Sequence, residues 1–231
     1  MKNDLALADW VDPSTSALIV VDVQNDFCHS EGVFGKRGFD MGAIQDIFPP
    51  LRRLMKEARG VGVSVVLFQV VHSPDCNWSA YHRLERLKSG SADGGPDDTL
   101  SGAGGMGSDL VVEGTWGADL CEGFEPEPGD ILLKKNRYGG FTGTNLDLIL
   151  RSLGVKTILM TGVATNVCVE STAREGFMLD YNVVMVDDAC ATTSREEHEG
   201  TLLNCRNYFG RVATVHEVAA AWAEHSVAVK T

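Results

Sequence analysis

The chain has 231 residues, and its 32 acidic and 20 basic side chains give a formal net charge of −12 at pH 7. This acidic balance argues against nucleic acid or an anionic membrane surface as a partner. No apolar run approaches the roughly 20 residues that a membrane span needs, and residues 1–12 mix charged with apolar side chains, unlike a signal peptide. The six cysteines form no close pairs, which fits a reducing compartment, so we expect a cytoplasmic protein.

Strands and helices are expected to alternate along the chain. Apolar runs predict strands at 17–22, 61–71, 131–133, 156–160, 182–186 and 212–215. Helices are expected at 43–59, 79–87, 145–153, 165–179 and 194–208, with a closing helix from 216; the apolar face of the first consists of Leu51, Leu54, Met55 and Ala58. The alternation predicts a single α/β domain over 1–231, a three-layer αβα arrangement around a mostly parallel sheet.

Acidic residues follow the first predicted strand. Asp22 ends the apolar run, and Asn25 and Asp26 belong to the loop after it. Ligands of open α/β sheets bind at the carboxyl ends of the strands, so Asp22 is a candidate general base with a perturbed pKa. The alternative is an aspartate that only ties down a loop by accepting backbone hydrogen bonds, and Asp26 fits that role better than Asp22.

A long segment without periodicity follows the second strand and a short helix. Residues 88–107 are rich in Gly, Ser and Asp. Loops of this length in compact domains are usually lids, subunit contacts or disordered segments, and we expect a lid or a subunit contact here.

Two lysines stand at the end of the third predicted strand, before a glycine-rich turn. If the strand continues that far, Lys134 and Lys135 lie on opposite faces, one toward the crevice and one toward solvent. A crevice lysine beside an aspartate and a cysteine would hold both as anions. The alternative is two solvated lysines at a strand end.

A cysteine follows the fourth predicted strand. Gly162 ends that strand, and Thr165 or Asn166 can cap the next helix, which puts Cys168 in or near its first turn. Helix N-termini favour anions, and the thiolate is the nucleophilic form of cysteine. The alternative is an inert buried thiol.

Taken together, these segments resemble the isochorismatase-like cysteine hydrolases. The resemblance rests on the order and spacing of VVDVQNDF (20–27), KNRYGGFTGT (135–144) and GVATNVCVESTAR (162–174), and it extends from about Ser16 to about Val218. It implies a Rossmann-like fold and an Asp-Lys-Cys triad at Asp22, Lys135 and Cys168. True isochorismatases lack this cysteine, so the resemblance points to an amide or ureide hydrolase.

Within that family, the segments TWGADL (115–120) and PGDI (128–131) are similar to those of ureidoacrylate and related N-carbamoyl amidohydrolases. The resemblance implies that Asp22 takes the thiol proton, that Cys168 attacks the carbonyl, and that Lys135 stabilises the charges. It also implies an oxyanion hole from the backbone N–H groups of Ala164 and Cys168, and a cis peptide bond between Val163 and Ala164. The expected substrate contacts are Phe27, Gln69, Trp116, Tyr138 and Phe141, although such aromatic residues could equally be core.

No metal or other cofactor is expected. Nicotinamidases, a sister group, bind a metal through an Asp-x-His motif after the second strand, and residues 68–75 lack that motif. His72 fits a loop or pocket contact better than a metal ligand, and the cysteine spacing is not of the zinc type.

Other readings of the family resemblance stay open. The substrate could be biuret, carbamoylsarcosine, maleamate or nicotinamide, with ammonia or carbamate released, or the chain could be a non-catalytic homologue that binds a small ligand. The family resemblance further implies a homo-oligomer, either a dimer or a tetramer.

Overall fold

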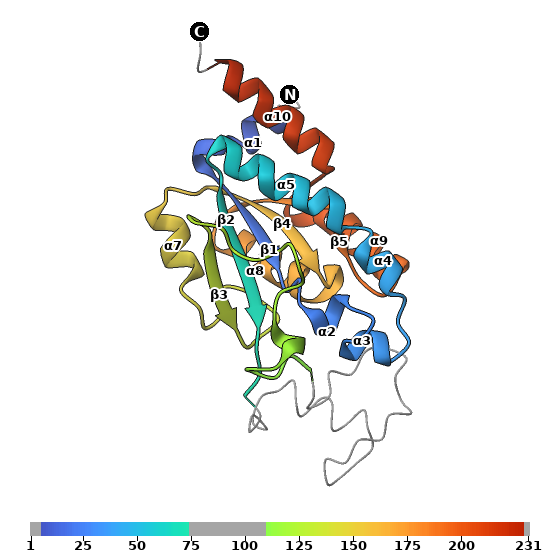
Figure 1. The fold of residues 1–231 in the computed structure, drawn as a ribbon. Helices are drawn as coiled ribbons and strands as arrows, with labels where there is room; N and C mark the ends of the chain where they lie inside the picture. Colours follow the sequence, from blue (N-terminus) through green and yellow to red (C-terminus); the bar gives the residue numbers. More distant parts are fainter. Residues whose placement is uncertain (1–5, 74–109, 229–231) are drawn as a thin grey trace.

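A computed structural model describes residues 6–73 and 110–228 of the chain. In these residues, six strands form one sheet in the order β3-β2-β1-β4-β5-β6, and every neighbouring pair is parallel (Figure 1). The strands are β1 Ser16–Val21, β2 Ser64–Val70, β3 Ile131–Lys135, β4 Thr157–Val163, β5 Asn182–Ala191 and β6 Arg211–Ala213. The predicted α/β fold is confirmed, with a sheet that is parallel throughout.

Helices flank this sheet. They are α1 Leu7–Trp10, α2 Asn25–Cys28, α3 Val33–Lys36, α4 Met41–Gln45, α5 Phe48–Val61, α7 Leu146–Ser152, α8 Glu170–Met178, α9 Arg195–Asn204 and α10 Val215–Ala228. Short 3-10 turns are η1 Pro13–Thr15 and η3 Trp116–Ala118, and single π-helical turns are η4 Thr165–Val169 and η5 Cys205–Phe209. The predicted helix 79–87 and loop 88–107 lie outside the described residues.

The predicted helix at 43–59 is two helices, α4 and α5. Proline occupies the first turn of α5, where its missing N–H costs no hydrogen bond and its fixed φ suits a helix start. The two prolines therefore begin a new helix instead of continuing α4. The apolar face predicted for this region is confirmed, because Leu51, Leu54, Met55 and Ala58 are all buried.

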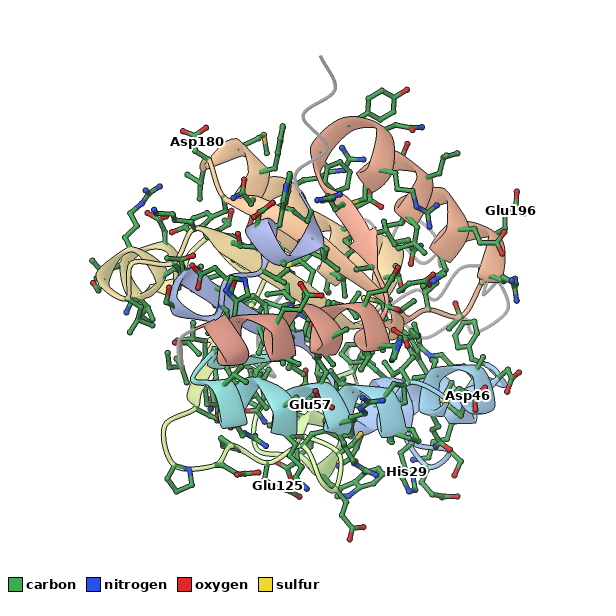
Figure 2. All side chains as sticks on the ribbon, turned by 90° about the horizontal axis from the view of Figure 1, so that it is seen from above. His29, Asp46, Glu57, Glu125, Asp180 and Glu196 are labelled. Atoms are coloured by element: carbon green, nitrogen blue, oxygen red, sulfur yellow. The ribbon has the colours of Figure 1, made fainter. Side chains whose placement is uncertain are left out.

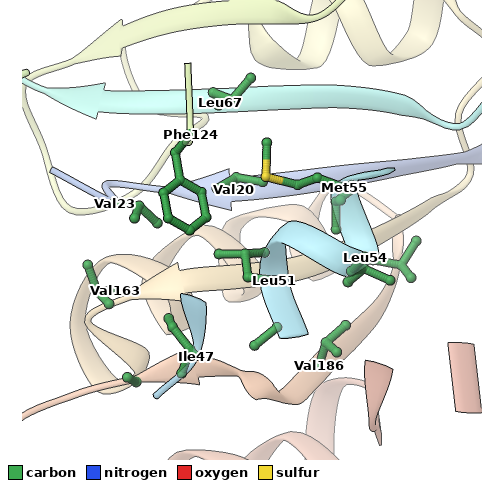
Figure 3. Close-up of a cluster of buried hydrophobic side chains, with 14 of the residues drawn as sticks. Val20, Val23, Ile47, Leu51, Leu54, Met55, Leu67, Phe124, Val163 and Val186 are labelled. Atoms are coloured by element: carbon green, nitrogen blue, oxygen red, sulfur yellow. The ribbon is translucent and has the colours of Figure 1, made fainter. Parts of the chain in front are cut away.

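The central strand β1 is buried along its whole length and separates two hydrophobic cores. Leu18 and Val20 pack into the core under α5 and α10, whereas Ile19 and Val21 pack into the core under α7 and α8. Figure 3 shows the first core, where α5 side chains such as Leu51 approach the strands. A strand covered on both faces reads as a continuous apolar run, which is why β1 was predictable.

Acidic side chains are spread over the outside of the molecule. Figure 2 labels Asp46, Glu57, Glu125, Asp180 and Glu196 at separate places on the surface instead of in one patch. Of the helices in residues 6–73 and 110–228, none has the length and apolar character to cross a membrane.

The strand order places a topological switch at β1. The chain passes from β1 outward to β2 and β3 on one side, then returns to add β4 on the other side of β1. Crevices at the carboxyl ends of strands beside such a switch are where α/β proteins bind ligands. The segments after β1 and β4 therefore define the place to look for a site.

Candidate active site

Asp22, Lys135 and Cys168 come together at the carboxyl ends of β1, β3 and β4. Nζ of Lys135 lies 2.6 Å from Oδ2 of Asp22, and both side chains are fully buried. The Cys168 thiol interacts with both of these groups, because each of them shifts its pKa. The structure thus joins the three side chains that the sequence motifs singled out.

The alternation of side chains along β3 explains which lysine enters the site. Lys135 is buried and also donates a hydrogen bond to the carbonyl of Arg137 at 3.0 Å. Lys134 points the other way and pairs with Glu113 at 2.9 Å, with both side chains more than half exposed. The prediction that the two lysines lie on opposite faces is confirmed.

The backbone around Asp22 is held by β2. Asp22 has a φ of 51°, in the left-handed region, and its N–H donates to the carbonyl of Phe68. Two residues on, the Gln24 side chain pairs with both backbone groups of Val70, each at 2.9 Å. These bonds fix the turn that aims the Asp22 carboxylate at Lys135.

Asp26 has the structural role that the sequence analysis gave as the alternative to catalysis, because it holds a loop through backbone hydrogen bonds. Its carboxylate accepts hydrogen bonds from the backbone N–H groups of Val33 and Val111, at 3.2 and 2.6 Å. A Cβ on Gly117 would collide with this carboxylate, so the η3 turn packs directly against it. Asp26 is therefore a structural anchor for the walls of the site.

Burial is the largest single effect on the pKa of each triad residue. It raises the pKa of the Cys168 thiol to about 12, and the negative charge of Asp22 adds to this while Lys135 opposes it. Burial also raises the pKa of Asp22 against the opposing effect of Lys135. Burial disfavours the charge of Lys135, but Asp22 and Cys168 outweigh it and raise the pKa of that amine. Lys135 favours the thiolate of Cys168, as expected of a neighbouring cation, but desolvation has the larger effect on the pKa of the thiol.

The turn that carries Cys168 packs tightly against β1. Gly162 has a φ of +100°, and a Cβ there would strike the carbonyl of Val21. The bond between Val163 and Ala164 is cis. The chain then forms the π-helical turn η4 before α8 begins.

The predicted caps of this helix are wrong. Ala164 occupies the N-cap position and makes no side-chain cap, so Thr165 and Asn166 already lie inside the first turn. Their side chains instead form hydrogen bonds with α9 and with the segment that follows β5. The Thr165 hydroxyl pairs with the ring of His198 at 2.9 Å, and the Asn166 amide oxygen accepts from Thr192 at 2.8 Å.

The glycine-rich turn after Lys135 is fastened to the helix after Cys168. The Thr172 hydroxyl donates to the carbonyl of Cys168 and accepts from the N–H of Gly140. Farther along α8, Glu175 accepts from the N–H of Phe141 at 2.8 Å. The segments that present the lysine and the cysteine are therefore braced against each other.

A pocket opens beside Cys168, and its roughly 500 Å³ of empty space includes open solvent. Its lining is mostly apolar and consists of Phe27, Phe34, Ile44, Tyr138, Val163, Ala164, Val167, Cys168, Thr192 and Thr193. Four of these residues were singled out from the sequence, namely Phe27, Tyr138, Ala164 and Cys168.

Sequence reasoning missed the other walls. Thr192 and Thr193 directly follow β5, so the rule that strand ends face the crevice could have found them. Phe34 and Ile44 come from the short helices α3 and α4, and their positions carry no signal that separates pocket wall from core.

The remaining predicted contacts lie outside the lining of this pocket. Phe141 packs in the core against the ring of Tyr181, with centroids 5.6 Å apart. Trp116 is 49% exposed and meets His29 edge-on. Gln69 donates to the carbonyl of Ala118 at 3.2 Å. Because none of these three residues lines the pocket, the pocket gives no support to their predicted contacts with substrate.

His72 serves as a backbone tie between β2 and a later loop. Its N–H donates to the carbonyl of Val111, and its carbonyl accepts from the N–H of Glu113. In the described part of the chain, no three His, Cys, Asp or Glu side chains gather as metal ligands would.

The chain is similar to known proteins in both sequence and fold. Residues 16–217 match the family model described as the Isochorismatase domain. A ureidoacrylate amidohydrolase RutB of Enterobacter sp. (strain 638) is 35% identical over 223 residues, covering 94% of this chain and 93% of the relative. A RutB protein of Methylorubrum extorquens is 36% identical over 220 residues, covering 91% of this chain and 84% of the relative.

Two solved structures have the same fold. A cysteine hydrolase from Pseudomonas syringae pv. phaseolicola 1448A superposes with a TM-score of 0.76 at 26% identity, covering 94% of this chain and 96% of the other. N-carbamoylsarcosine amidase from Thermoplasma acidophilum superposes with a TM-score of 0.65, also at 26% identity, covering 87% of this chain and 96% of the other.

Proposed function

The chain belongs to the isochorismatase family as an amidohydrolase of C–N bonds other than peptide bonds, and we propose that its substrate is a small ureide of the ureidoacrylate type. The observation that carries the proposal is the buried Asp22–Lys135 ion pair, which shifts the pKa of a thiol that lines a mostly apolar pocket. The relatives named as ureidoacrylate amidohydrolases support the ureide over other amides.

The proposed reaction begins with proton transfer from the Cys168 thiol to the Asp22 carboxylate. Because burial raises the pKa of the thiol, this transfer accompanies attack on the carbonyl, when the new S–C bond disperses the negative charge of sulfur. The backbone N–H groups of Ala164 and Cys168 are the proposed donors to the oxyanion. Asp22 then gives the proton to the departing nitrogen as the C–N bond breaks.

Release of the acyl group reverses these roles. Asp22 takes a proton from water, the water oxygen bonds to the acyl carbon, and the C–S bond breaks. The proton returns to sulfur, so the thiol and carboxylate are restored. Lys135 remains an ammonium throughout and offsets the negative charge that moves between Asp22 and Cys168.

A substrate panel tests this proposal. We expect kcat/KM for ureidoacrylate to exceed that for biuret, carbamoylsarcosine, maleamate or nicotinamide by about tenfold or more, as loss of matched polar contacts costs at least that much. Product release is followed as ammonia, with carbamate counted through its decay to ammonia, with and without EDTA. A better substrate elsewhere in the panel would overturn the assignment to a ureidoacrylate-type substrate. Activity lost to EDTA and restored by zinc or manganese would overturn the metal-free mechanism.

We further propose a cytoplasmic homo-oligomer, a dimer or a tetramer. Large apolar side chains exposed on the outer helices support self-association, because a subunit contact would remove their apolar surface from water. The most exposed are Leu148 on α7, Met178 on α8, Leu203 on α9 and Tyr208 on η5.

A further inference from the structure

A second hydrogen-bonded chain of side chains ends on the turn that carries Cys168. Oδ1 of Asp187 lies 2.9 Å from Nε2 of His198, and Nδ1 of the same ring lies 2.9 Å from the hydroxyl of Thr165. Thr165 is fully buried and is the first residue of η4, three positions before Cys168. No step of the proposed hydrolysis uses these three residues.

The sheet is distorted where Asp187 leaves it. β4 and β5 pair at Met160 with Met185 and again at Gly162 with Cys190, so β5 carries the extra residues of a bulge between the two pairs. Asp187 lies in this bulge. Helix α9 lies beside β5 (Figure 1), contacts both β5 and η4, and supplies His198. Bulges beside active sites often re-aim a side chain, and this one turns a carboxylate toward the helix.

For a neutral His198 ring, the chemistry of the three groups fixes the direction of the hydrogen bonds. A carboxylate only accepts, so His198 donates from Nε2 to Asp187. In the neutral ring Nδ1 is then an acceptor, and the Thr165 hydroxyl donates to it. The carboxylate thus sets the tautomer, and the tautomer sets the orientation of the threonine.

The arrangement has the residue types of a hydroxyl nucleophile with its base, but its position excludes that use. Thr165 has no exposed surface and is not in the pocket lining, whereas Ala164, Val167 and Cys168 of the same turn are. Thr165 cannot touch a substrate in this pocket. Its effect on the reaction must pass through the backbone of η4.

We propose that Thr165, His198 and Asp187 are positioning residues that hold η4 in the geometry in which the Cys168 thiol and the neighbouring amide donors meet one carbonyl. This inference rests on the proposed covalent hydrolysis. Rate depends steeply on such alignment, because small misplacements of reacting groups lower kcat. Most of the pocket walls, including Phe27, Phe34 and Tyr138, lie outside η4, so KM should move less than kcat.

Paired substitutions test the role of the hydroxyl. Thr165→Val keeps the shape but removes the hydrogen bond, and we expect it to lower kcat by about tenfold or more with KM within about threefold. Thr165→Ser restores the hydroxyl and should retain at least about a third of wild-type kcat. His198→Ala should match Thr165→Val, and the double variant should lose little more, since both remove one interaction.

Thr201→Val is the matched control. Its hydroxyl also crosses from α9, but it bonds to the carboxylate of Glu170, the first residue of α8, at 2.6 Å instead of to Thr165. We expect its kcat to stay within about twofold of wild type. An equal loss of kcat in Thr201→Val, or wild-type kcat in both Thr165→Val and His198→Ala, would overturn the proposal. The partly exposed ring of His198 keeps the test available if Thr165→Val folds poorly.

A readout without substrate separates this inference from the proposed function. The rate of Cys168 alkylation by iodoacetamide, measured by peptide mass spectrometry, should fall by about fivefold in Thr165→Val and recover in Thr165→Ser, because the thiol loses its alignment with its base. If the wild type hydrolyses none of the ureides, the proposed function fails while this alkylation pattern still supports the positioning role. Unchanged alkylation in both Thr165→Val and His198→Ala overturns the positioning role whatever the substrate.

Discussion

Lys135 keeps its charge in a fully buried position because the Asp22 carboxylate lies 2.6 Å away. Lys135→Ala would leave that carboxylate buried and unpaired, which costs about 3–5 kcal/mol of unfolding free energy in comparable cases. We expect kcat to fall by about a hundredfold or more, since the group cooperates with Asp22 and Cys168. Steady-state kinetics and urea unfolding check both effects.

Lys134→Ala is the matched control for this change. It removes a lysine from the adjacent position, where the amine pairs with Glu113 in solvent. Exposed pairs contribute about 0–1 kcal/mol, so stability and kcat should stay close to wild type. Similar losses in the two variants would show that the buried pair has no special role.

The raised pKa of Asp22 predicts the acid limb of the pH profile. The carboxylate must be ionised to accept the thiol proton, and burial, opposed by Lys135, raises its pKa above the ordinary 3.8. Activity should therefore be lost as pH falls through a value above 3.8. Because the pKa of Lys135 is raised above 10.5, that group should cause no loss below about pH 10. Measurement of kcat/KM across about pH 4–10 tests this, and a profile flat down to about pH 4 would contradict it.

Individual residues were predictable only where a pattern fixed their direction. Alternation along β3 and a family motif distinguished Lys135 from Lys134. The protonation of Cys168 was not predictable, because burial is a property of the assembled site and here exceeds the effect of the neighbouring cation. His198 and Asp187 gave no signal, since each lies far in the sequence from Thr165 and meets it only through folding.

Among the secondary-structure elements, the end of β4 is the most constrained. Gly162 combines a φ of +100° with backbone contact to Val21, so Gly162→Ala should lower the unfolding free energy by about 2 kcal/mol or more. Gly60→Ala, in α5 with open space around it, should instead raise it by about 0.5–1 kcal/mol. Urea unfolding measures both changes. Equal stability of the two variants would contradict the close approach of β4 to β1.

Most strands were predictable as elements, but irregularities were not. β1 and β4 are buried apolar runs bounded by polar residues or glycine. β5 extends past the predicted end at 186 because it continues through two aspartates that sit in a bulge. The π-helical turns η4 and η5 escaped prediction because a single wide turn barely alters the spacing of apolar residues.

At the scale of the whole molecule, we predict that the protein self-associates. Sedimentation velocity at assay concentration should show a dimer or a tetramer. Met178→Glu, which puts a charge on the most apolar outer surface of α8, should shift the distribution toward monomer if that helix forms the contact, since a buried unpaired charge is strongly unfavourable. A fully active monomer of the wild type would contradict the proposed oligomer.

The central claim is that Cys168 is the nucleophile of this amidohydrolase. The most direct test is the turnover number of Cys168→Ala on whichever amide or ureide the wild type hydrolyses fastest, with Cys205→Ala, another buried thiol, as control. We predict a loss of at least about a thousandfold in Cys168→Ala, an unchanged fold by circular dichroism, and turnover near wild type in Cys205→Ala. Retention of more than about a tenth of wild-type turnover in a folded Cys168→Ala would contradict the covalent mechanism.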